Sequence, residues 1–131
     1  MKARISQPKE QVLFYNIDKQ KSDELLKLMN EYSIEFNEIK EDMCGQTLGY
    51  LLKWNGFEEN NDLFSNSNPV DSECLIFCRI DRSKMNNLLS EIRKRNLNVD
   101  LKAGVTASNQ SWKFHDLLLE LQREHNKLHN R

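Results

Sequence analysis

Two stretches of the chain show the same succession of apolar and polar positions. Residues 12–15 read Val-Leu-Phe-Tyr, an apolar run of strand-forming residues, and residues 21–32 follow with apolar side chains at helical spacing. Residues 34–36, Ile-Glu-Phe, then alternate between apolar and polar, which is typical of a strand with one buried face. The pattern predicts a β-α-β unit over residues 12–36.

The same order recurs at an offset of 63 residues, which places residue 75 at the position of residue 12. Residues 75–78 read Leu-Ile-Phe-Cys, a helical stripe follows over 85–92, and an alternating segment runs over 97–105. The pairs Ile17-Asp18 and Leu25-Leu26 recur as Ile80-Asp81 and Leu88-Leu89. This agreement predicts an internal duplication over residues 12–36 and 75–99, with chance similarity of two ordinary units as the competing explanation.

The strand patterns also predict places in a sheet. The first strand of each copy is apolar on both faces, as in a central strand, whereas the second alternates with charged or amide residues, as at an edge. Such strands predict a ferredoxin-like α/β (α+β) sheet of order 4-1-3-2, with right-handed crossovers that place both repeat helices on one face. The alternative is a small doubly wound parallel sheet, in which a helix at 42–54 serves as a crossover.

The second face of this sheet needs a cover. If Phe14 and Phe77 point at the repeat helices, the side chains of Leu13 and Ile76 point the opposite way and form an apolar surface. Two additional helices are predicted to cover it, one over residues 42–54 and one that follows Asn109 as its N-cap.

The length of the chain fits one domain. A chain of 131 residues with 38% hydrophobic side chains can bury a core without disulfide or metal staples. Residues 1–10 are polar and predict a flexible N-terminal tail, which leaves residues 11–131 as a single α/β domain. Residues 55–73 contain acidic residues but no Lys or Arg, and they predict a long acidic loop that is either a lid or disordered.

Charge and cysteine content restrict the partners. The chain has 19 basic and 20 acidic residues, so it lacks the basic field that draws in nucleic acid. The sequence has neither a signal-peptide pattern nor an apolar stretch of the ~18 residues that a membrane span needs. Its three cysteines indicate free thiols in a reducing compartment. We therefore expect a cytoplasmic protein that binds neither nucleic acid nor membrane.

Two segments hold the candidate ligand-binding residues. One would open the helix near residue 42, where glycines four residues apart allow close approach and free amides can hold an anion. The other segment is a turn of hydroxyl and amide residues before the last helix. This turn could line a pocket together with the glycine-containing segment. Tight helix packing and structural capping are the alternative explanations. The candidates are Gly45, Gln46, Thr47, Gly49, Tyr50, Thr106, Asn109 and Trp112.

Catalytic chemistry is not evident in the sequence. Cys44 would lie in the first turn of the helix near 42, where the helix dipole lowers a thiol pKa, but no base can be assigned to it. His125 and His129 have the spacing of two metal ligands without a third. We therefore predict no catalytic residue, no metal and no cofactor, and expect a non-catalytic regulatory module that binds a small molecule or a protein. The alternatives are a small enzyme with its site at that helix N-terminus and a homodimeric interaction subunit.

Three parts of the chain resemble a known family. Residues 12–16, residues 45–51, and the stretch from Leu101 through Thr106 and Asn109 to Trp112 are similar to an uncharacterised bacterial family, domain of unknown function 3783. The resemblance covers about residues 11–126. It implies that the Gly-Gln and Asn-x-x-Trp segments belong together, and it supplies no activity. Family members often carry Pro-His where this chain has Ala107-Ser108, so no histidine of that turn is available here.

Overall fold

The computed structural model describes residues 9–60 and 70–129, a mixed α/β domain built on one four-stranded sheet. Residues 1–8 of the predicted tail and residues 61–69 of the predicted acidic loop at 55–73 lie outside the described residues. In chain order the described elements are β1 (Gln11–Tyr15), α1 (Lys19–Glu31), β2 (Glu35–Ile39), the 3₁₀ helix η1 (Glu41–Met43), α2 (Leu48–Leu51), β3 (Cys74–Cys78), α3 (Arg82–Lys94), β4 (Leu101–Gly104), the 3₁₀ helix η2 (Asn109–Ser111) and α4 (Phe114–His129).

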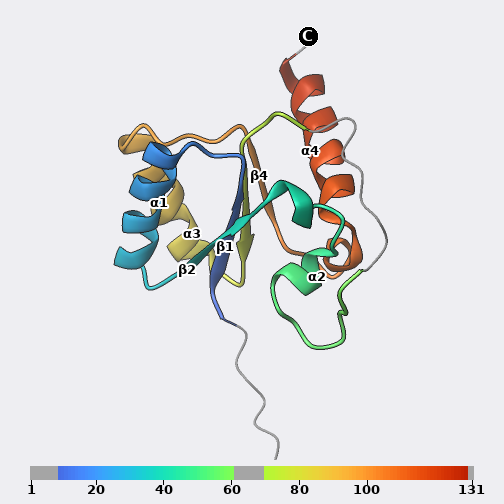
Figure 1. The fold of residues 1–131 in the computed structure, drawn as a ribbon. Coiled ribbons are helices and arrows are strands. Elements are labelled where there is room, and N and C mark those ends of the chain that lie inside the picture. Colours follow the sequence, from blue (N-terminus) through green and yellow to red (C-terminus); the bar gives the residue numbers. More distant parts are fainter. Residues whose placement is uncertain (1–8, 61–69, 130–131) are drawn as a thin grey trace, which may run out of the picture.

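The sheet has the order β2-β1-β3-β4 (Figure 1). β1 and β3 are central and antiparallel to each other, and each pairs in parallel with the second strand of its own unit. The prediction of central first strands and edge second strands is therefore confirmed. The predicted ferredoxin-like order 4-1-3-2 is wrong, and the antiparallel central pair also rules out the doubly wound parallel sheet.

The apolar pattern could not distinguish the two orders, because both have the same central and the same edge strands. They differ in which edge each second strand occupies. Residues 40–73 separate β2 from β3, and α2 within this range lies on the second face of the sheet, so no short hairpin connects β2 to β3. β2 instead pairs with β1, from which it is separated only by the crossover helix α1.

The β-α-β pattern repeats in the elements and in the turns between them. β1 and α1 recur as β3 and α3 at the offset of 63. The N-cap residues Asp18 and Asp81 each accept a hydrogen bond from the backbone N–H three residues later, which stabilises the first turn of the helix. Left-handed backbone conformations also recur in pairs, at Asn16 and Arg79 and at Ser33 and Asn96.

Two ion pairs join the repeats reciprocally. Lys21 Nζ lies 2.8 Å from Glu73 Oε1, and Lys84 pairs with Glu10 in the same way. We expect Glu73→Gln to lower the free energy of unfolding by about 1 kcal/mol, because the pair is only about one-quarter exposed. Urea unfolding measures the loss. The exposed pair between Lys19 and Asp23 supplies the control, since Asp23→Asn should change stability by less than ~0.5 kcal/mol. Equal effects of the two substitutions would contradict the prediction.

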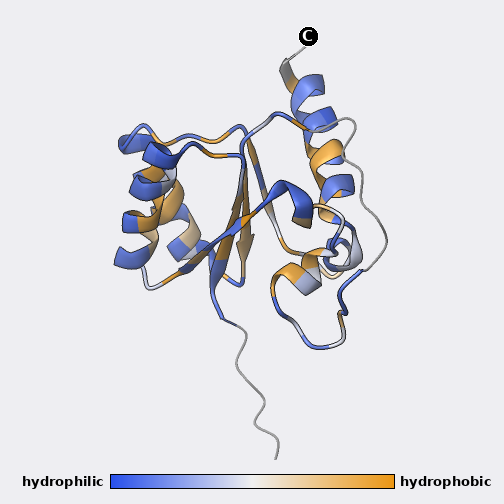
Figure 2. Ribbon diagram, in the orientation of Figure 1, coloured by the Kyte–Doolittle hydropathy of each residue, from blue (hydrophilic) through white to orange (hydrophobic). Residues whose placement is uncertain are grey.

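Two apolar clusters lie on opposite faces of the sheet, and Figures 1 and 2 show the helices that cover each face. α1 and α3 cover one face, where Val12, Leu75 and Phe77 pack against helix residues such as Leu25 and Leu88. α2 and α4 lie on the other face, over side chains that alternate with these along the strands. This second cluster includes Leu13, Tyr15, Ile76, Cys78, Leu48, Phe114 and Leu118. The predicted cover of the second face is confirmed.

The cover differs from the prediction in its helix boundaries. The expected helix at 42–54 is divided into η1 and the four-residue helix α2, because Thr47 is extended and caps α2 through its side chain. Asn109 does not cap the last helix: it begins η2, and α4 starts at Phe114 after an extended Trp112. β4 is also shorter than the alternating segment 97–105, although Leu97 and Val99 are buried in the first cluster.

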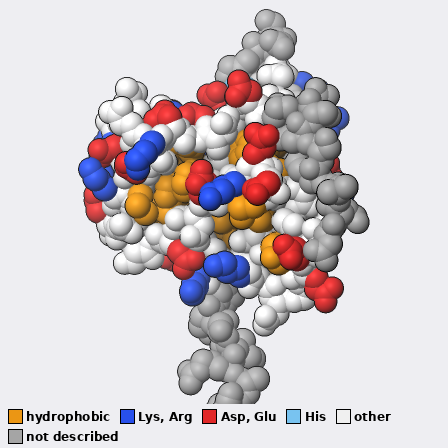
Figure 3. Space-filling view, in the orientation of Figure 1, with side chains coloured by type: hydrophobic (Ala, Val, Ile, Leu, Met, Phe, Trp, Pro, Cys, Tyr) orange, Lys and Arg blue, Asp and Glu red, His pale blue; other side chains and the backbone are white. Residues whose placement is uncertain are grey.

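Charges of both signs are mixed on the face in Figure 3, in keeping with the net charge of −1. Within residues 9–60 and 70–129, no helix has the length and apolar character to cross a membrane.

Candidate functional site

The two candidate segments lie side by side through backbone pairing. Thr47 and Lys113 form an antiparallel bridge. The N–H of Leu48 donates to the Trp112 carbonyl at 2.9 Å, and the N–H of Phe114 donates to the Gln46 carbonyl at 2.9 Å. The structure therefore brings the Gly45–Tyr50 and Thr106–Trp112 segments together, as the sequence suggested.

Most of the predicted polar side chains are engaged in local structure. The Gln46 side chain donates to the Asn60 carbonyl and accepts from the Asn60 N–H, at 3.0 and 2.7 Å. The Thr47 hydroxyl accepts from the Tyr50 N–H. Thr106 and Asn109 each accept from the backbone N–H of the other, which closes the turn after β4. These contacts assign capping and loop closure to the four side chains.

The two candidate glycines lie within the packed interior. Gly45 is buried, and its carbonyl accepts a hydrogen bond from the Asn60 side chain at 3.2 Å. A Cβ on Gly49 would lie 2.5 Å from the ring of Phe57, so this glycine lets α2 approach the following segment closely. Tyr50 is half-buried, and Trp112 is 38% exposed.

Cys44 is not at a helix start. It follows η1, is fully buried, and its thiol lies 3.8 Å from the Lys40 carbonyl oxygen. Burial raises the pKa of this thiol to about 11, whereas a helix N-terminus was expected to lower it. Burial also raises the pKa of the neighbouring Tyr15 to about 12. The Cys44 thiol therefore stays protonated at neutral pH and is a poor nucleophile.

The remaining thiols and histidines form no metal site in the described part of the chain. Cys74 and Cys78 are free and buried like Cys44, as predicted. His125 is half-buried on α4. Among the side chains of residues 9–60 and 70–128, no group of three or more His, Cys, Asp or Glu residues is placed to hold a metal ion.

A cavity of about 380 Å³ lies beyond the carboxyl ends of β3 and β4. Three separate segments line it. They are Trp54 after the turn that ends α2, the end of β3, and the turn after β4. The lining residues are Trp54, Cys78, Arg79, Val105, Thr106, Ala107 and Gln110. Of these the sequence singled out only Thr106. A second lining residue, Arg79, could have been found by comparing the two repeats. Arg79 occupies the position that Asn16 has in the first repeat, so the two repeats differ in charge there.

The cavity combines one cation with aromatic and polar groups. The guanidinium carbon of Arg79 lies 5.4 Å from the centroid of the Trp54 ring, within the range of a cation–π contact. The indole Nε1 of Trp54 is buried and has no hydrogen-bond partner among the described residues. Gln110 donates to the Ala107 carbonyl, so its amide oxygen is still able to accept. Burial raises the pKa of Cys78 to about 11, so the thiol is neutral at physiological pH.

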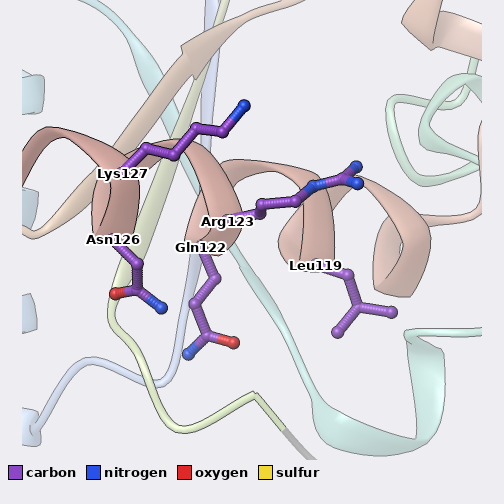
Figure 4. A pocket seen from close by; sticks show the side chains of 5 residues that line it. All are labelled: Leu119, Gln122, Arg123, Asn126 and Lys127. Atoms are coloured by element: carbon purple, nitrogen blue, oxygen red, sulfur yellow. The ribbon is translucent and has the colours of Figure 1, made fainter. Parts of the chain in front are cut away.

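A second hollow, of about 460 Å³, lies along α4 (Figure 4). Its five lining residues all belong to this one helix, and Figure 4 shows their side chains spreading in different directions. The residues are Leu119, Gln122, Arg123, Asn126 and Lys127. Side chains that diverge from one helix do not converge on a small molecule, so the cavity at Arg79 is the better candidate site.

Fold and cavity together define a mixed α/β domain with a candidate ligand site where two parallel strands end. Residues 73–128 match the model of a family described as a domain of unknown function, DUF3783. The predicted resemblance is thus confirmed from β3 to α4, a range that contains every cavity residue except Trp54. No curated protein and no solved structure matches the chain at the significance threshold.

Proposed function

We propose that this chain is a non-catalytic module that binds a small molecule in the cavity bounded by Trp54, Arg79 and the turn after β4. One observation carries the proposal: three segments distant in sequence place an aromatic ring, a guanidinium, a hydroxyl and an amide around one cavity. Small-ligand sites typically combine apolar walls with a few polar groups. In α/β sheets they also lie preferentially beyond the carboxyl ends of parallel strands, where β3 and β4 end here.

The chemistry of the cavity favours binding over catalysis. Its titratable nucleophile, Cys78, is kept neutral by burial, and the buried Cys44 is kept neutral in the same way. Burial of all three thiols without disulfides also fits a reducing compartment, and we include a cytoplasmic location in the proposal. The residues first predicted as ligand contacts then serve mainly to hold the cavity walls, with Thr106 belonging to both groups.

A fragment screen followed by two-dimensional NMR tests this function. We expect bound fragments to shift the indole N–H resonance of Trp54 and the backbone amide of Arg79, because both residues line the cavity. The indole of Trp112 is the internal control, since it is the same group in a position outside the lining. Shifts confined to Arg123 and Lys127 would move the site to α4. A bound fragment recovered as a new product would contradict the non-catalytic proposal.

A further inference from the structure

The residue after the first strand has the same backbone conformation in both repeats, but its side chain is an amide in one repeat and a guanidinium in the other. Asn16 and Arg79 have φ angles of 59° and 62°, in the left-handed region. Asn tolerates this region better than most residues, because its short side chain can hydrogen-bond locally, whereas Arg has no such compensation. Strained residues of this kind occur preferentially at functional sites. Arg79 therefore adopts a conformation that Asn, the residue at the equivalent position of the first repeat, adopts at lower cost.

The surroundings of the two positions are opposite in character. The side chain of Asn16 hydrogen-bonds to the Asp71 carboxylate at 3.4 Å, and Glu41 and Asp71 are close enough to add to the raised pKa of Tyr15. The end of β1 is therefore acidic, and Asp71 of the same chain already binds the Asn16 side chain there. The corresponding end of β3 in the second repeat has the cavity and the exposed side chain of Arg79, which forms no ion pair among residues 9–60 and 70–128.

We propose that the ligand is a small organic carboxylate, bound through the guanidinium of Arg79; the inference rests on the proposed binding function. A guanidinium held beside a ring keeps its N–H donors, and their fork matches the two oxygens of a carboxylate. Trp54, Val105 and Ala107 offer apolar surface for the body of the ligand. The Thr106 hydroxyl and the Gln110 amide add polar contacts at the rim. A cavity of about 380 Å³ admits a molecule of this size.

Benzoate, with benzamide as its neutral counterpart, is the probe for this inference. The full-length chain carrying Trp112→Phe leaves Trp54 as the single tryptophan, so its fluorescence reports on the cavity. We expect saturable quenching by benzoate, a higher melting temperature in its presence, and binding of benzamide at least about tenfold weaker. Benzoate affinity should also fall as the salt concentration rises.

Arg79→Asn is the decisive variant, because it installs the residue of the first repeat. We expect it to weaken benzoate binding by about tenfold or more while the melting temperature of the free protein stays equal or rises. Arg79→Lys keeps the charge without the fork and should bind with intermediate affinity. Trp54→Phe retains the ring and removes the unpartnered N–H, so its free protein should be no less stable.

Equal affinity for benzoate and benzamide, or unchanged benzoate binding in Arg79→Asn, would overturn the carboxylate assignment. Quenching by inorganic phosphate but not by benzoate would also overturn it and would assign the cation to a phosphate ligand. In either case, neutral fragments that still shift the Trp54 indole resonance would leave the binding function standing. If neither benzoate nor any fragment reaches Trp54, the assignment and the function fail together.

Discussion

The free energy of unfolding is expected to fall steeply as the pH rises from 9 towards 11. Burial raises the pKa of Cys44 and Cys78 to about 11 and that of Cys74 to about 12, from an ordinary value of 9.0. Below pH 9 the thiols are protonated in both states and contribute no pH dependence. Above pH 9 the unfolded chain loses thiol protons that the folded chain retains, so the unfolded state is favoured.

The size of this effect is large for a domain of this length. Each thiol contributes ~1.4 kcal/mol per pH unit in the window between its two pKa values. Three thiols together give ~4 kcal/mol per unit, against a typical total stability of ~5–15 kcal/mol. Tyr15 adds to the loss above pH 10, because its pKa is raised from 10.0 to about 12.

Urea unfolding at a series of pH values from 8 to 11 measures the slope. Cys74→Ala removes the thiol with the largest rise in pKa, so it should flatten the pH dependence even though it lowers stability at pH 8 by leaving a cavity. The slope, rather than the absolute stability, is therefore the readout. A slope that is the same with and without Cys74, or stability that stays constant up to pH 11, would contradict the assignment to buried thiols.

Gly49→Ala should destabilise the protein by ~1–3 kcal/mol, although alanine is the better helix former. The added Cβ would lie 2.5–2.6 Å from carbon atoms of the Phe57 ring, so the ring or α2 must move. A larger side chain, as in Gly49→Leu, should cost more. Urea unfolding monitored by circular dichroism gives the free energy directly.

Two matched variants separate this clash from a general effect of replacing glycine. In a Phe57→Ala background, Gly49→Ala should become neutral or stabilising, because the obstacle is gone and helix propensity remains. Gly104→Ala in β4 adds a Cβ whose nearest neighbour is the Phe77 carbonyl oxygen at 3.9 Å, so it should be neutral or slightly stabilising. Destabilisation by Gly49→Ala of equal size with and without Phe57 would contradict the packing explanation.

The β-α-β repeat and the two-faced sheet were predictable from the sequence, because both follow from local periodicity. Alternation along a strand determines which side chains share a face, so Leu13 and Ile76 could be assigned opposite Phe14 and Phe77 before any contact was known. The Ile-Asp pairs that supported the repeat contain Asp18 and Asp81, which the structure shows to be the N-caps of α1 and α3. Strand alternation and helix starts each depend on residues only a few positions apart in the sequence.

The order of the strands and the location of the site were decided only by tertiary structure. Edge character shows that β2 and β4 are outer strands, but not which central strand each one joins. The protonated state of Cys44 depends on burial under distant segments, and no local pattern reports that burial. Trp54 and Arg79 meet only because residues 40–54 fold over the second face of the sheet, next to the end of β3. Contacts of this range arise when the chain is packed, which is why the sequence identified only Thr106 among the residues that line the cavity.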